Sequence, residues 1–166
     1  MFQKRILYFL VYNTYGVLSR IAGLFSRRGY NIDSITAGVT ADENFTRITV
    51  VCSGDDAILG QITNQLSKLV DVRDIKVLDP QQSVVRETVL VKVAAKPEQR
   101  DGIISVANIF RASIVDVSRD SLVVEMTGSK SKLEAFIDLM GDYEILELAR
   151  AGVTGLSRGS GGVCYF

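Results

Sequence analysis

The sequence predicts an α+β protein built from two consecutive β-α-β-β-α-β units, each with its own antiparallel sheet. The first observation is that strand-like alternation and helix-like spacing of apolar residues follow one another in that order. The second is that the whole order occurs twice along the 166 residues. The third is a hydrophobic content of 47%, which lets a chain of this length bury two small cores.

The first unit begins with an apolar strand and ends near Asp79. Its segments, in order, are the strand RILYFLVYN, the helix GVLSRIAGLFSRRG, the strands YNIDSITAGVT and FTRITVVCSG, the helix DDAILGQITNQLSKL and the strand VDVRDIKVLD. Gly29 is expected to end the first helix, and the Asp pair suits the start of the second. Helical spacing predicts a buried face on the first helix, made of Val17, Leu18, Ile21, Ala22 and Phe25.

The second unit repeats this order. Its segments are the strand RETVLVKVAA, the helix EQRDGIISVANIFRA, the strands SIVDVS and SLVVEMTG, the helix SKSKLEAFIDLMG and the strand YEILELARAG. In the last helix, Ser131 and Glu134 have the spacing of a capping box. Arg111 is expected near the C-terminal end of the preceding helix, where its charge suits the helix dipole. The β-α-β-β-α-β order is that of ferredoxin-like folds, so we predict two tandem ferredoxin-like domains.

Four segments follow from these elements. Residues 1–79 are expected to form the first domain, 80–84 a linker, 85–151 the second domain and 152–166 a tail. The tail sequence VTGLSRGSGGVCYF has few apolar residues, and we expect it to pack loosely. In each domain both helices are expected on one sheet face, which leaves the other face and the sheet edges to be covered. Self-association as a homodimer is the simplest way to cover them.

Charge and composition argue against two classes of partner. The chain has 19 basic and 19 acidic residues, and both halves are close to neutral, with 9 and 8 up to Pro80 and 10 and 11 after it. Nucleic-acid binding is therefore not expected, and FTRITVVC lacks the stacking aromatics of an RNA-binding strand. The apolar run ILYFLVY is far shorter than the roughly 20 residues of a spanning helix, so no membrane segment is expected.

The cysteine and histidine content limits the possible chemistry. Cys52 and Cys164 have no metal-ligand spacing; we expect Cys52 to be a buried small hydrophobe and Cys164 an exposed free thiol, as in the reducing cytosol. The chain has no histidine, which excludes Ser-His-Asp and Cys-His catalysis and imidazole metal sites but leaves carboxylate or lysine chemistry open. The carboxylates considered for acid–base catalysis lie on different elements, and none forms a catalytic pair: Asp116, Asp120, Glu125 and Glu134.

The stretch from Asn13 to Ile35 is the strongest candidate for a binding site. Gly16 lies where a strand passes into a helix, and a glycine lets a ligand approach the backbone closely. The first helical N–H groups lack intrahelical acceptors and can receive a carboxylate. The carboxamides of Asn13 and Asn31 can accept hydrogen bonds from an ammonium group. A helix cap and a simple turn explain the same residues, and spacing alone leaves both interpretations open.

The segment NTYGVLSRIAGLFSRRGYNIDSIT resembles the opening of an ACT domain, specifically that of the acetolactate synthase small (regulatory) subunit family. The resemblance continues through QLSKLVDV, RETVLVKV, IFRASIVDVS and LELARAGVTGLSRG, and covers Arg5 to about Gly159. The combination of RGYNI with ARAGVTGLSRG is the specific part, because N-x-x-G-V-L alone occurs in many ACT domains.

The resemblance implies a regulatory rather than a catalytic chain. It implies a catalytic large subunit as partner, which this chain activates and makes sensitive to feedback inhibition by valine or a related branched-chain amino acid. No cofactor is expected in this chain; thiamine diphosphate, Mg and FAD are implied for the catalytic subunit. A cytoplasmic location and a homodimer formed through paired ACT domains are also implied.

The effector site implied by the resemblance lies between two protomers. Asn13, Gly16 and the backbone of Val17 come from one protomer, and Asn31 and Ile32 approach from the other. Thr36 is a further, weaker member of the set. The sequence departs from the family pattern beside this site, because many relatives have an acidic residue in place of Tyr12 and a small residue or Pro in place of Tyr15.

Other functions and residue roles are kept beside this one. A stand-alone ACT-type amino-acid sensor without an enzyme partner is the main alternative, and a small ferredoxin-like enzyme or RNA-binding module is a third. Arg20, Arg27 and Arg28 are candidates for a docking surface or for an ordinary solvated helix face. Arg150 and Arg158 have no evident core role, which makes them candidates for partner contacts.

Overall fold

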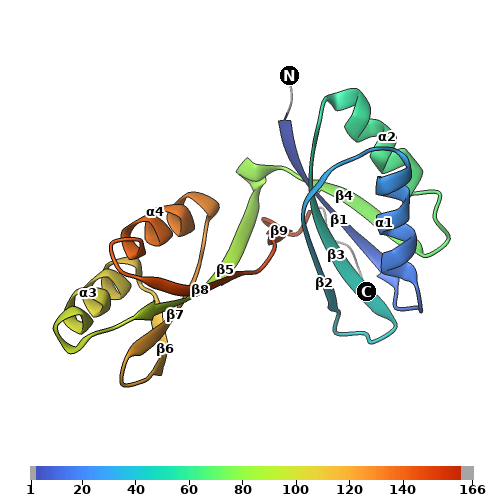
Figure 1. The fold of residues 1–166 in the computed structure, drawn as a ribbon. Coiled ribbons are helices and arrows are strands. Elements are labelled where there is room, and N and C mark those ends of the chain that lie inside the picture. The colour runs from blue at the N-terminus through green and yellow to red at the C-terminus, as the bar shows by residue number, and fades with distance from the viewer. Residues whose placement is uncertain (1–2, 162–166) are drawn as a thin grey trace. The chain divides into compact units, whose positions relative to one another are not determined.

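The computed structural model describes residues 3–161, which form two compact units (Figure 1). The second unit is the continuous stretch Val85–Gly152. The first unit combines the chain before it with the segment that begins at Val153. Each unit has the β-α-β-β-α-β order, with four strands in line along its antiparallel sheet, so the predicted tandem ferredoxin-like fold class is confirmed.

The first unit has the strand order β2-β3-β1-β4, and both of its helices cover the same face of the sheet (Figure 1). Its elements are β1 (Gln3–Tyr12), α1 (Val17–Arg27), β2 (Ile32–Val39), β3 (Phe45–Gly54), α2 (Asp56–Leu66), β4 (Val72–Leu78) and the short 3-10 helix η1 (Pro80–Gln82). Asp55 caps α2 by accepting a hydrogen bond from the Ile58 N–H at 2.8 Å, as the Asp pair predicted.

The second unit has the equivalent strand order β6-β7-β5-β8, again with both helices on one face. Its elements are β5 (Ser83–Ala94), whose first two residues belong to the first unit, the 3-10 helix η2 (Pro97–Gln99), α3 (Arg100–Phe110), β6 (Ser113–Val117), β7 (Ser121–Gly128), α4 (Lys130–Met140) and β8 (Ile145–Arg150). Arg111 ends α3 with a left-handed conformation (φ 56°), which agrees with its expected position at the helix end.

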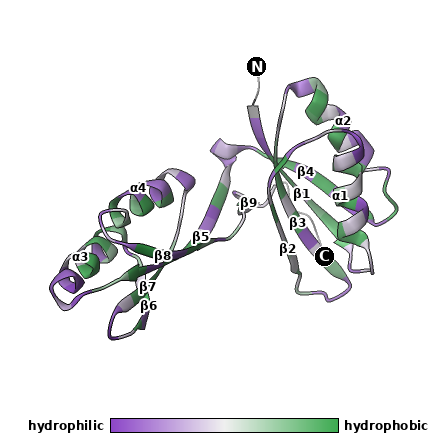
Figure 2. Cartoon of the chain, in the orientation of Figure 1, coloured by the Kyte–Doolittle hydropathy of each residue, from purple (hydrophilic) through white to green (hydrophobic). Residues whose placement is uncertain are grey.

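Each core lies between a sheet and its helices, and Figure 2 shows the hydrophobic residues concentrated in these elements. In the first unit the helix-side core includes Phe9, Ile21, Phe25 and Ile48. The opposite face carries a smaller cluster of Tyr8, Leu10, Phe45 and Leu78. Alternate residues of β1 thus pack on opposite sides of the same sheet, which is why the run ILYFLVY is apolar throughout.

Two local expectations are wrong. The buried face of α1 consists of Val17, Ile21, Leu24 and Phe25, whereas Leu18 and Ala22 are exposed. The capping box is absent because α4 begins at Lys130. Ser129 is therefore the N-cap residue, and it makes no side-chain cap hydrogen bond.

The tail expected from residue 152 contains a strand instead, β9 (Thr154–Ser157), which pairs with β5. Long-range contacts define it. The Val153 N–H donates to Ser34 Oγ at 3.1 Å, and the Arg158 N–H donates to the Gln82 carbonyl at 2.7 Å. Part of the open face of the first unit is therefore lined by β9 of the same chain.

Cys52 is fully buried in the core, which confirms its expected role, and burial raises the pKa of its thiol to about 11. Cys164 lies outside the described residues.

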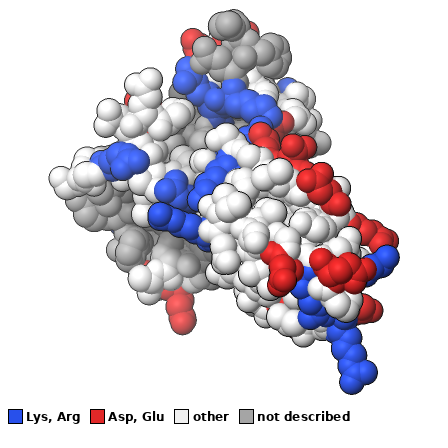
Figure 3. Space-filling model, turned by 90° about the vertical axis from the view of Figure 1, so that its left-hand side faces the viewer, with Lys and Arg blue, Asp and Glu red and all other residues white. Residues whose placement is uncertain are grey.

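On the face drawn in Figure 3, basic and acidic side chains lie among uncharged surface. Within residues 3–161, none of the helices is long and apolar enough to cross a membrane.

Candidate functional site

The turn between β1 and α1 is built by backbone and carboxamide hydrogen bonds. The Asn13 N–H donates to the Asn44 carbonyl at 2.8 Å, and its Nδ2 donates to the Glu43 carbonyl at 3.0 Å. Thr46 Oγ1 donates to Asn13 Oδ1 at 3.2 Å. The Asn13 side chain is exposed, and Oδ1 keeps a second lone pair that can accept a hydrogen bond from another donor. Asn13 therefore both orders the turn and offers an acceptor at its surface.

Gly16 gives the turn its shape. Its φ of 77° lies in the left-handed region, and it is the N-cap residue of α1, with no side-chain cap at this end. The Val17 N–H donates to the Thr14 carbonyl at 3.3 Å, and the Arg20 N–H is the first to reach back to Gly16, at 3.0 Å. The N–H groups of Leu18 and Ser19 therefore have no acceptor within the helix, which is the arrangement expected for carboxylate binding.

A hydrogen-bonded cluster of Arg20, Asp71 and Thr14 stabilises the same turn. Arg20 Nε donates to Asp71 Oδ2 at 2.7 Å, and Thr14 Oγ1 donates to Asp71 Oδ1 at 3.1 Å. The terminal nitrogens of Arg20 donate to the Tyr15 carbonyl at 3.3 Å and to Thr14 Oγ1 at 3.4 Å. The Asp71 carbonyl accepts from the Tyr12 N–H at 2.9 Å. The Asp71 carboxylate, directly before β4, thus connects the start of that strand to the turn.

The electrostatics of this cluster favour the ion pair. Hydrogen bonding from Arg20, and then from Thr14, lowers the pKa of Asp71 despite the burial of the residue. Hydrogen bonding to Asp71 raises the pKa of Arg20. Both groups therefore stay charged at neutral pH.

The second asparagine lies at the other end of the same helix. Asn31 precedes β2, is exposed and donates from Nδ2 to Asp33 Oδ1 at 2.9 Å. Helix α1 has 11 residues. At a rise of about 1.5 Å per residue it separates Asn31 from Gly16 by roughly 16 Å within one chain. Ile32, beside Asn31, packs against the helix-side core. One copy of the chain therefore does not bring the two asparagines together.

Thr36 lies on the opposite side of the sheet. It pairs with Thr49, which pairs with Tyr8 of the open-face cluster. Its hydroxyl is buried and has no hydrogen-bond partner among residues 3–161. The structure thus groups Asn13, Gly16 and Val17 at one turn, and it leaves Thr36 away from that group.

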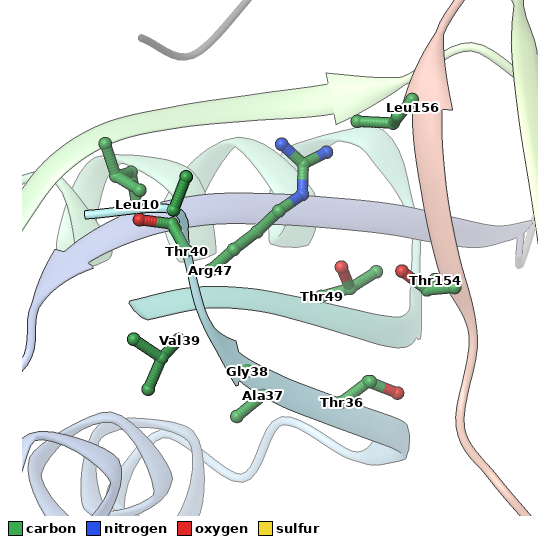
Figure 4. Close-up of a pocket in the computed structure, with 11 residues that line it drawn as sticks. Leu10, Thr36, Ala37, Gly38, Val39, Thr40, Arg47, Thr49, Thr154 and Leu156 are labelled. Atoms are coloured by element: carbon green, nitrogen blue, oxygen red, sulfur yellow. The ribbon is translucent and has the colours of Figure 1, made fainter. Parts of the chain in front are cut away.

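Thr36 lines a separate cavity of about 340 Å³ on the open face, shown in Figure 4. The cavity is bounded by the outer part of β2, by β3 and by the returning strand β9. Arg47 extends across it, with its guanidinium 4.1 Å from the Tyr8 ring centroid, and donates to the Gly155 carbonyl at 2.8 Å. Arg47 therefore connects β9 to the sheet through this hydrogen bond.

The sequence analysis did not predict a role for Thr14 or for Asp71, which precedes β4, and it placed Arg20 only on the surface. In the structure these three residues form one cluster. The available signal was the Arg at the fourth position after Gly16, which returns to the helix start after one turn. Arg150, a candidate for partner contacts, donates from Nε to Glu87 Oε2 at 2.7 Å.

The architecture of the first unit, with its glycine turn leading into α1, is that of an ACT domain. Residues 7–74 match the family model described as the AHAS small subunit-like ACT domain. Residues 86–159 match the model described as the small subunit of acetolactate synthase.

Whole-chain comparisons agree with both matches. The chain is 49% identical to a "Probable acetolactate synthase small subunit" of Archaeoglobus fulgidus, over 95% of this chain and 99% of the relative. It is 46% identical to the acetolactate synthase small subunit of Bacillus subtilis, over 95% and 92%. The crystal structure of the acetolactate synthase small subunit from Thermotoga maritima superimposes with a TM-score of 0.90 at 38% identity, covering 95% and 99%. The chain belongs to the acetolactate synthase small-subunit family.

Proposed function

We propose that this chain is a non-catalytic regulatory subunit that binds and activates a thiamine-diphosphate-dependent catalytic subunit. Membership of the small-subunit family carries the proposal, since the relatives named above are small subunits of that enzyme. The catalytic subunit would hold the cofactors, including Mg and FAD. A cytoplasmic location stays a prediction.

The second part of the proposal is feedback inhibition by valine or a related branched-chain amino acid. The turn at Gly16 supports it, because the unpaired N–H groups of α1 suit an α-carboxylate and Asn13 Oδ1 suits an ammonium group. The Val17 backbone belongs to the same turn. The roughly 16 Å between the ends of α1 supports a site in which Asn31 and Ile32 come from a second copy. The proposed site is therefore one formed by a homodimer of ACT domains.

The mechanism is a population shift. An effector that binds one dimer arrangement better than another favours that arrangement by its difference in affinity. If the catalytic subunit is less active with the favoured arrangement, valine inhibits it without touching the reacting groups. Thr36 stays the weakest member of the proposed site, because it lies on the other sheet face.

Calorimetric titration with valine, isoleucine and leucine tests the site. Binding is expected for the wild-type chain, with a large loss for Asn13→Ala. Analytical ultracentrifugation over a range of concentrations tests the homodimer. A chain that binds none of the three amino acids contradicts the effector site.

Reconstitution with the purified catalytic subunit tests the regulatory role. Addition of the chain is expected to raise acetolactate synthase activity, and valine is expected to reverse part of the increase. A chain that binds an amino acid but neither binds nor activates the catalytic subunit is a stand-alone sensor, and the regulatory-subunit proposal is then wrong.

A further inference from the structure

The guanidinium of Arg20 lies at an electrostatically unfavourable position. It folds back to the first turn of α1, where the helix dipole is positive and repels a cation. An atom in the Cβ position of Gly16 would lie only 3.2 Å from Arg20 Nη1. The group is thus held close to the glycine turn, so its placement there calls for a physical reason.

Asp71 compensates for the charge and fixes the orientation of the guanidinium. Its side chain is only 10% exposed, whereas that of Arg20 is 47% exposed. The short contact of 2.7 Å uses Nε, on the inner edge of the guanidinium. The longer contacts of 3.3 and 3.4 Å use one hydrogen each of Nη1 and Nη2. Each terminal nitrogen therefore keeps a second N–H group for another acceptor.

The half-exposed guanidinium and the unpaired N–H groups of Leu18 and Ser19 lie at the same end of α1. Both favour an anion, and a carboxylate has two oxygens that can be divided between them. We propose that Arg20, oriented by Asp71 and Thr14, binds the effector's carboxylate and makes the site specific for an amino acid over its neutral amide. This inference rests on the proposed effector-binding function and adds a specificity-determining residue to it.

A purely structural role for Arg20 makes a different prediction. If Arg20 only braces the turn through Tyr15 and Thr14, its loss weakens every ligand of the turn to the same extent. If it contacts the carboxylate, its loss weakens valine far more than valinamide, which keeps the ammonium group and the side chain. The ratio of the two affinities therefore separates the roles.

The test is a calorimetric titration of valine and of valinamide into the wild-type chain and the Arg20→Met variant. The wild type is expected to prefer valine, and Arg20→Met is expected to lose about 10-fold or more of that preference, as for a charge-assisted hydrogen bond. Arg20→Lys keeps the charge and is expected to restore part of the preference. Arg27→Met, on the exposed last turn of the same helix, is the matched control and is expected to keep the wild-type preference for valine over valinamide.

Asp71→Asn is the second variant, because it keeps the guanidinium but removes the charge that orients it. A partial loss of the preference is expected. Amide NMR spectra of each variant establish that the first unit is folded. Equal weakening of both ligands in Arg20→Met, or an unchanged ratio, overturns the inference and leaves the proposed function intact. A wild-type chain that binds neither ligand overturns the proposed function, and the inference with it.

Discussion

Gly16 is the residue at which the backbone itself limits substitution. With φ at 77°, an alanine would adopt a left-handed conformation, and its Cβ would lie 3.2 Å from Arg20 Nη1. Gly16→Ala is expected to lower the free energy of unfolding by about 1–2 kcal/mol and to weaken effector binding. Urea denaturation measures the first effect.

Gly60→Ala is the matched control for this prediction. Gly60 lies inside α2, and an added Cβ meets no atom within 4 Å. Because alanine is the better helix former, the free energy of unfolding of this variant is expected to rise by about 0.5–1 kcal/mol. Equal effects at the two glycines would mean that the left-handed turn is not maintained in solution.

Asp71 is expected to make the stability of the first unit depend on acid. Hydrogen bonding from Arg20 lowers its pKa below the ordinary 3.8, so the folded chain holds this carboxylate ionised where the unfolded chain begins to protonate it. Its contribution is complete above the ordinary value and is lost as the pH falls through the folded pKa. Urea midpoints measured from neutral to strongly acidic pH are expected to fall more for the wild type than for Asp71→Asn.

The same series needs an exposed carboxylate as a control. Asp138→Asn, on the exposed side of α4 in the second unit, is expected to follow the wild-type curve. Asp33 also has a lowered pKa, through Ser53 and Lys4, and contributes equally to both variants. Parallel curves for the wild type and Asp71→Asn would contradict the ion pair.

At the scale of elements, β9 is expected to depend on Arg47. The side chain stacks on Tyr8 and donates to the Gly155 carbonyl, and both contacts lie on the open sheet face. Arg47→Met removes a hydrogen bond and a cation–π contact, each of about 0.5–1.5 kcal/mol. Hydrogen exchange of the Val153 and Arg158 amides, which bond to Ser34 and Gln82, is expected to become faster.

Arg86→Met provides the comparison for Arg47. Within residues 3–161 its guanidinium bonds to the carbonyl of the neighbouring Val85, at 2.8 Å, and not to β9, so exchange at Val153 is expected to stay at the wild-type rate. Unchanged exchange at Val153 and Arg158 in Arg47→Met would mean that β9 is held by its backbone contacts alone.

Elements with a strong local pattern could be predicted from the sequence, whereas β9 could not. The alternation in FTRITVVCSG and the cap at Asp55 are local signals, and both correspond to the observed β3 and α2. VTGLS has few apolar residues, and the strand it forms pairs with β5 and is contacted by Ser34 and Arg47, which lie more than 100 residues away. Arg20 and Asp71 are likewise separated by 51 residues, so no local pattern connects them.

At the scale of the whole molecule, each core cluster is formed by one unit. The clusters around Phe25 and Tyr8 belong to the first unit, and the cluster around Phe136 belongs to the second. A fully buried phenylalanine replaced by alanine costs about 3–5 kcal/mol. Since every other member of each cluster lies in the same unit, the loss is expected to be confined to that unit.

The reciprocal pair Phe25→Ala and Phe136→Ala tests this independence, because both side chains are almost fully buried in cores of similar construction. Amide spectra with increasing urea are expected to show the first unit unfolding earlier in Phe25→Ala and the second unit unfolding earlier in Phe136→Ala. Valine binding belongs to the first unit in the proposed function, so Phe136→Ala is expected to keep the wild-type affinity below its own transition. If Phe136→Ala also shifts the unfolding of β1 and α1, the two units fold as one cooperative body. In that case an effector bound at Gly16 acts on both units together.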